Sequence, residues 1–213
     1  MHSNRPYPLL LSIFSVWLLI LNANPAAAVI IDKIAAIVNE AVITQSELQS
    51  MERLDLQLSG LPRKNSILQE RIDFHLALQQ LKTQPPVLVP EEELEDAIAS
   101  LQLRHGGEEE LNQFLSTIGI NRDDLLVEVR NQLSIRKFIR DRFRPFVNIT
   151  LEDAEDYYEK VYRPAGEMLA KEVPPFAEVF SEIQNLLVDS KIQERILEWL
   201  EEMRQEARIN IKD

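Results

Sequence analysis

The residues that most often carry enzyme chemistry are sparse or poorly placed in this chain. Its three histidines are His2 near the start, His75 in an apolar helical stretch, and His105 just before a pair of glycines. Each position favours a structural role over metal binding or acid–base work. The runs Glu91–Glu93 and Glu108–Glu110 stand at expected helix starts, where acids complement the helix dipole. We interpret them as solvated helix starts rather than a metal site or a hydrolytic dyad.

Sequence motifs of catalysis are also missing. The chain has no nucleophile elbow, no phosphate-binding loop and no zinc-type spacing, and it contains no cysteine. We therefore predict that it is not an enzyme and that it has no catalytic residues, cofactor or metal.

Apolar side chains are the other candidates for function, because they could bind peptide. Methionine and aromatic residues suit adaptable binding surfaces. The alternative is that the same residues form the core. The candidates for a groove that holds extended apolar peptide are Met51, Leu54, Leu61, Phe74, Phe114 and Phe146.

These candidates need a scaffold, and the stretch Val29 to Leu48 begins it. Its β-branched residues predict a strand hairpin with a turn at Asn39-Glu40. Thr44 and Glu47 then predict a capping box at the start of a helix. A lone hairpin is marginal in water, so we expect it to recruit a further strand. Two short segments could supply that strand: Val147–Ile149 and Ala207–Ile211.

Helical periodicity covers most of the remaining chain. The last and longest stripe runs from Phe176 to Met203, and we expect Leu186 at its centre to be buried. Phe146–Ile149 reads as a strand, and Arg163–Val173, with Pro164 and Gly166, as a linker. Helices are expected over 45–58, about 66–82, 90–105, 108–117, 121–145, 150–162 and from Pro174 onward.

Residues 1–28 have the pattern of a cleaved secretory signal. Arg5 precedes the apolar run Leu9–Leu21, and Ala26–Ala28 supply small residues for cleavage. The run is shorter than the roughly 20 apolar residues of a spanning helix, so we expect no stable membrane insertion after cleavage.

The remaining chain is acidic. Removing residues 1–28 takes away one base, Arg5, and leaves 22 basic and 35 acidic residues, a charge of −13. This charge argues against a nucleic-acid partner, because phosphate binding depends on Lys and Arg. The lack of cysteine excludes a disulfide framework and agrees with a bacterial periplasm.

Four segments resemble the SurA-like periplasmic chaperones, in the same order along the chain. They are Asp32–Asn39 (DKIAAIVN), Val89–Ile98 (VPEEELEDAI), Val129–Lys160 and Pro174–Asp213. The resemblance implies a lobe formed by the N-terminal helices together with the distant C-terminal helix. It also implies binding of unfolded outer-membrane protein segments rich in aromatic residues, without ATP.

The chain departs from that family in the middle. Members usually carry parvulin-type prolyl isomerase domains between the helix that ends near Tyr162 and the terminal helix. Here the eleven residues Arg163–Val173 stand in that place, whereas an independent domain needs roughly 50. We therefore divide the chain into a signal (1–28), an N-terminal chaperone region (29–162), a linker (163–173) and a C-terminal helix and strand (174–213).

The predicted fold is mostly α, a multi-helix chaperone lobe with a small sheet. That sheet joins the hairpin strands Ile30–Val38 and Val42–Ile43 to the C-terminal strand Ala207–Ile211. The predicted function is that of an ATP-independent periplasmic holdase for unfolded exported polypeptides. One alternative is an assembly subunit with one fixed partner, and another is a prolyl isomerase with an unrecognised site. The oligomeric state stays open.

Overall fold

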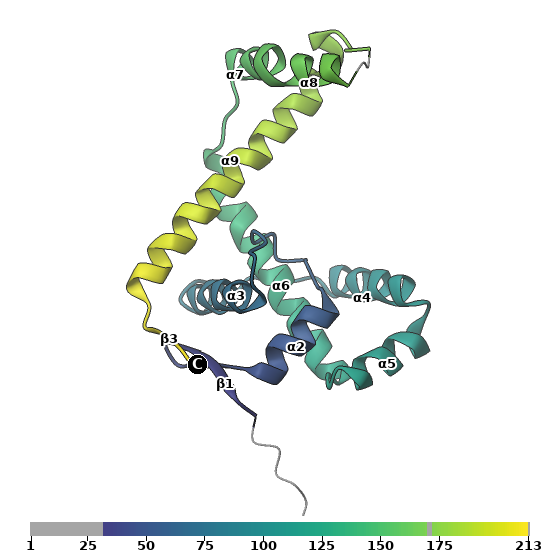
Figure 1. Ribbon diagram of the computed structural model, residues 1–213, viewed down its shortest axis with the longest axis vertical. Helices are drawn as coiled ribbons and strands as arrows, with labels where there is room; N and C mark the ends of the chain where they lie inside the picture. The colour runs from purple at the N-terminus through teal and green to yellow at the C-terminus, as the bar shows by residue number, and fades with distance from the viewer. Residues whose placement is uncertain (1–31, 170–171, 213) are drawn as a thin grey trace, which may run out of the picture. The chain divides into compact units, whose positions relative to one another are not determined.

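The computed structural model describes residues 32–169 and 172–212 (Figure 1). The predicted signal, 1–28, and the expected start of the first strand at Ile30 lie outside these residues. The prediction of a mostly helical chain with a small sheet is confirmed. The elements are β1 (Ile34–Val38), β2 (Ala41–Thr44), α2 (Gln45–Leu54), α3 (Ile67–Lys82), α4 (Glu91–His105), α5 (Glu108–Thr117), α6 (Arg122–Phe143), α7 (Leu151–Tyr157), α8 (Arg163–Met168), α9 (Phe176–Glu206) and β3 (Ile209–Ile211).

The sheet joins the two ends of the described chain. Its order is β2-β1-β3, and both pairings are antiparallel. Figure 1 shows β3 beside β1, where Ala36 lies opposite Ile211 and Val38 opposite Ile209. The turn residue Asn39 has a φ of 54°, the left-handed conformation that asparagine tolerates. The predicted hairpin and its recruitment of a strand from Ala207–Ile211 are thus confirmed, whereas Val147–Ile149 joins no strand.

The capping box predicted at Thr44 is only half formed. The Thr44 hydroxyl accepts a bond from the Glu47 backbone N–H at 3.3 Å. The Glu47 carboxylate, however, contacts Arg71 and His75 on α3 instead of returning to Thr44. A charged partner on a neighbouring helix therefore prevails over the local backbone bond.

Helix α9 packs against two separate groups of neighbours. Near its N-terminus, Val179 and Ile183 contact Ala154 and Tyr158 of the α7 region. Near its C-terminus, α9 shares a core with α3 and α6, made of Phe74, Ala77, Ile135, Phe138, Ile139, Phe143, Ile196, Trp199 and Leu200. The expectation for Leu186 was wrong, because this side chain is 44% exposed. The buried apolar side chains of α9 face one group of neighbours near its N-terminus and another near its C-terminus, so the buried side of the helix changes along its length. Leu186 lies on the side that neither group covers.

The segment after α6 is not the strand that its sequence predicted. Residues Arg144–Phe146 form a 3-10 turn. Val147 and Ile149 then pack with Val188 of α9, while Asn148 between them is exposed. The alternating pattern is that of an extended segment lying on a helix, without pairing in the sheet.

The expected linker 163–173 begins with a helix. The chain runs from α7 through a π-helical turn, Tyr158–Tyr162, directly into α8. Pro164 explains the turn, because it has no N–H for the carbonyl of Lys160 and its ring would clash there. In the wider turn, the Arg163 N–H bonds the carbonyl of Tyr158, five residues earlier, rather than the carbonyl four residues earlier as in an α-helix. At Gly166, a Cβ atom would lie 2.7 Å from Val173, so glycine allows the chain to fold back closely.

Candidate peptide-binding pocket

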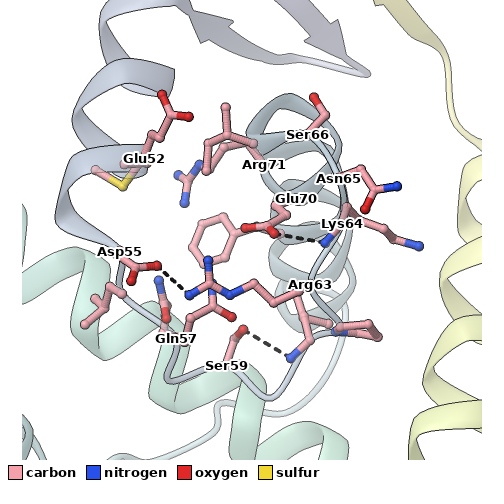
Figure 2. Close-up of a pocket in the computed structure, with 17 residues that line it drawn as sticks. Glu52, Asp55, Gln57, Ser59, Arg63, Lys64, Asn65, Ser66, Glu70 and Arg71 are labelled. Carbon is pink, nitrogen blue, oxygen red and sulfur yellow. Dashed lines mark hydrogen bonds and ion pairs between the residues drawn. The ribbon is translucent and has the colours of Figure 1, made fainter.

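A pocket of about 210 Å³ lies between the end of α2, the loop that follows it, and the first turns of α3 (Figure 2). This volume is below the 300–1,000 Å³ of typical small-molecule sites. The lining combines apolar, hydroxyl, amide and charged side chains. The lining residues are Met51, Glu52, Asp55, Leu56, Gln57, Ser59, Leu61, Pro62, Arg63, Lys64, Asn65, Ser66, Ile67, Glu70, Arg71, Phe74 and Gln132.

The loop exists because α2 ends earlier than its periodicity predicted. Asp55 makes the last helical bond, from its N–H to the carbonyl of Met51, and its φ of 48° then ends the helix at Leu54 instead of Leu58. The loop is then tied down at several points. Leu56 is buried, and the N–H of Leu58 donates to Oε1 of Gln132 on α6 at 2.8 Å. The pocket wall is therefore a fixed loop.

Behind the pocket lies a buried ionic network centred on Arg71. Its Nη1 is 2.8 Å from Oε1 of Glu128, and its Nη2 is 2.8 Å from Oε1 of Glu47. The guanidinium also lies over the ring of Phe74, 4.1 Å from the centroid, which is a cation–π contact. Gln132 completes the network by donating to Glu128 at 2.9 Å. Two carboxylates thus hold one cation, and the network carries a net negative charge.

The pKa of Glu47 reflects this network. Burial alone raises the pKa of the carboxyl, but the hydrogen bond from His75 and the charge of Arg71 outweigh it and hold the pKa below its ordinary value. Nε2 of His75 lies 3.3 Å from Oε1 of Glu47. Glu47 therefore stays ionised at neutral pH and keeps Arg71 in place over the ring of Phe74.

The rim of the pocket is charged and exposed. Arg63 pairs with Asp55 at 2.5 Å, which links the start of the loop to its middle, as Figure 2 shows. The N–H of Lys64 donates to Oε1 of Glu70 at 2.9 Å. The Arg63–Asp55 pair is exposed, where ion pairs are weak, so a ligand can displace it at little cost. The Lys64–Glu70 hydrogen bond is part-buried.

The structure brings together three of the six predicted binding residues. Met51, Leu61 and Phe74 all line the pocket. Phe74 is nevertheless 5% exposed and belongs mainly to the core shared with α9. Met51 and Leu61 are half-buried, so a ligand can reach them.

The other three predicted residues lie elsewhere. Leu54 is buried in the core of α4, α5 and α6. Phe114 stacks on His105, with the ring centroids 4.4 Å apart. Phe146 is 72% exposed in the 3-10 turn after α6. The prediction missed the polar lining, of which Gln57, Arg63 and Gln132 are examples, because it considered apolar side chains alone. A loop was expected between the helices over 45–58 and about 66–82, and the structure starts it earlier, at Asp55.

The described residues show no metal centre and no membrane span. Within 32–169 and 172–212, no three potential ligand side chains gather as they would around a metal ion. In the same ranges, every helix is too short or too polar to cross a bilayer.

Comparison with solved structures identifies the fold. No protein-family model and no curated protein matches the chain. The chain is similar to a solved structure from work on two structurally related SurA-like chaperones of Campylobacter jejuni, the virulence factor PEB4 and the periplasmic protein Cj1289. The two chains are 14% identical with a TM-score of 0.51, over 85% of this chain and 100% of the other. The protein therefore has the fold of the SurA-like chaperones, as its sequence predicted.

Proposed function

We propose that this protein is an ATP-independent chaperone that holds unfolded exported polypeptides in the periplasm. The observation that carries the proposal is the fold shared with a SurA-like chaperone over that chain's whole length. The acidic composition and the lack of cysteine support an exported protein whose stability comes from packing.

The pocket between α2 and α3 supports the same function. Its wall offers the half-buried side chains of Met51 and Leu61 beside the charged rim of Asp55 and Arg63. A mixed surface of this kind can accept varied side chains, because the flexible thioether of Met51 adapts its shape. We infer that Met51 and Leu61 contact the client, and that Phe74 supports them from the core.

A matched pair of tryptophan variants tests the pocket. Gln57 is exposed at its rim, whereas Gln113 is exposed on α5 and does not line it. We expect the native protein to slow aggregation of several unrelated unfolded proteins without ATP. Gln57→Trp should reduce this protection several-fold by filling the pocket, and Gln113→Trp should leave it unchanged. Equal protection by both variants would remove the pocket from the proposal.

The same assay separates a chaperone from an assembly subunit. An assembly subunit would ignore the unfolded proteins and bind one folded partner. We further propose that the protein is not a prolyl isomerase, because only Arg163–Val173 lies between the last N-terminal helix and α9 in sequence. Catalysis of a proline-limited refolding phase, at a rate well above buffer, would contradict this.

We also propose that export removes residues 1–28. Mass spectrometry of the natively exported protein should find Val29 as the first residue. An intact Met1 on membrane-bound protein would mean that the segment is an anchor.

A further inference from the structure

The helical segment from α7 to α8 has a buried face and a separate, exposed apolar face. Ala154 and Tyr158 are buried against α9, and the Tyr158 hydroxyl donates to the Pro174 carbonyl at 2.9 Å. After the π turn, Tyr162 takes the next position on this buried side and packs in the same cluster. The inner face therefore continues through Tyr162 and not through Val161.

The π turn thereby directs an apolar stripe outward. Val161, Ala165, Met168 and Leu169 are all exposed, Met168 at 84% and Leu169 at 67%. Their spacing, i, i+4, i+7 and i+8, places them on one side of the helix. In an unbroken α-helix, Val161 and Ala165 would continue the face of Ala154 and Tyr158. We call these four residues the α8 stripe.

A turn of this kind is uncommon in proteins. Single π turns inside helices are rare and occur frequently at functional sites. Here Pro164 follows directly after the turn and favours it, because proline cannot continue the regular α-helical bonding, and the turn exposes the stripe. The exposure of the stripe thus follows from a specific feature of the chain.

The segment that carries the stripe, together with the start of α9, is strongly acidic in sequence. Between Leu151 and Val188 the sequence has nine acidic and three basic residues, a charge of −6, which is half of the −12 of the whole chain. Four of these acids lie within 4.0 Å of a base: Asp153, Asp156, Glu159 and Glu167. The other five form no ion pair within the described residues and are exposed: Glu152, Glu155, Glu172, Glu178 and Glu182.

These charges decide which partner fits the stripe. A second copy would bring another charge of −6 against the first, and like charges disfavour that contact. An anionic lipid surface is disfavoured for the same reason. We propose that the α8 stripe binds basic, amphipathic segments of unfolded polypeptides. Apolar side chains would cover Met168 and Leu169, and Lys or Arg side chains would lie beside the acids. This names the client class of the proposed chaperone, and so rests on that function.

The absence of cysteine makes a direct test possible. Ala165→Cys places a single thiol in the stripe for an environment-sensitive fluorophore. The probes are two synthetic peptides with the same apolar residues, one carrying lysines and the other glutamates. We expect the lysine peptide to bind at least about 10-fold more tightly in low salt, and this preference to shrink as salt screens the charges.

Two pairs of variants separate the local surface from the overall charge. Met168→Ser with Leu169→Ser should weaken the lysine peptide about 10-fold or more, whereas Leu103→Ser, at an equally exposed leucine on α4, should not. Glu167→Gln with Glu172→Gln should reduce the preference for lysine several-fold. Glu92→Gln with Asp96→Asn removes the same charge from α4 and should have little effect.

Three results would overturn the inference. They are equal binding of the two peptides, binding that is unaffected by loss of Met168 and Leu169, and a fluorophore signal that follows protein concentration without peptide. The last would mean that a second copy covers the stripe. If aggregation assays show protection while peptides bind without regard to charge, the proposed function stands and the inference about the α8 stripe fails. If the lysine peptide binds the stripe and no protection is seen, the inference stands and the proposed function fails.

Discussion

Asn39 and Arg208 are joined by two hydrogen bonds, although they are 169 positions apart in sequence. The N–H of Asn39 donates to the carbonyl of Arg208, and the N–H of Arg208 donates to Oδ1 of Asn39, both at 2.9 Å. Nδ2 of Asn39 also donates to Oε1 of Gln79 on α3 at 2.7 Å. One turn residue thus joins β1, β3 and α3.

Asn39→Ala should lower the free energy of unfolding by about 1–3 kcal/mol, because it removes two side-chain bonds and places a Cβ-bearing residue without them at positive φ. Asn39→Gly is the matched variant, since glycine adopts this φ without strain but also loses the bonds. Denaturant unfolding of both variants separates the two effects. Equal stability of Asn39→Ala and the native protein would show that this turn contributes nothing.

Ile183→Ala should destabilise the protein by about 2–5 kcal/mol, the usual range for a buried aliphatic side chain. Ile183 is fully buried against Ala154 and Tyr158. Leu186→Ala, three residues further along α9, should change stability by less than about 0.5 kcal/mol because Leu186 is exposed. Thermal or denaturant unfolding measures both, and a larger loss at Leu186 would contradict the packing described for α9.

The fold was largely predictable because its signals are local. The turn at Asn39, the helix starts expected at 121 and 150, and the helical periodicities each depend on a few neighbouring residues. The structure has all of them, with Asn121 and Thr150 as the capping residues. The errors arose where contacts between residues far apart in sequence determine the structure. The Glu47 carboxylate bonds Arg71 on α3 rather than the backbone at Thr44. The apolar side chains of α9 pack against two separate groups of neighbours, and the periodicity of α9 cannot reveal this.

The candidate site was less predictable than the fold. Three of its apolar residues were identified, but the sequence could not separate Met51, which a ligand can reach, from Leu54, which is buried. The left-handed conformation of Asp55 creates the loop, and no strong signal marks it. The stripe of α8 was likewise hidden, because a regular helix would have buried Val161.

Removal of residues 174–213 should unfold the N-terminal region. In the structure, Ile196, Trp199 and Leu200 complete the core of Phe74 and Phe138. The same deletion removes β3 and therefore opens one edge of β1. We expect the truncated chain to lose its cooperative thermal transition and to exchange its amide hydrogens quickly. A truncated protein that unfolds cooperatively at an unchanged temperature would mean that α9 is a separate arm.

The last prediction concerns the loss of folding stability at acidic pH. Because the pKa of Glu47 is lowered in the folded protein, its ionised form stabilises the fold, fully so above the ordinary value of 4.5. This stabilisation is lost as the pH falls below that value and passes through the folded pKa. Glu47→Gln should cost about 1–3 kcal/mol at neutral pH, because Arg71 loses one of its two carboxylates.

The stability difference between native protein and Glu47→Gln should therefore be present down to about pH 5 and shrink below pH 4.5. Glu52→Gln is the control, since Glu52 is an exposed acid on the same helix and should change stability by less than about 0.5 kcal/mol. Urea unfolding at a series of pH values measures all three proteins. A difference that stays the same down to pH 3 would show that the ionised Glu47 does not hold Arg71 in place, and that the floor of the pocket depends on Glu128 alone.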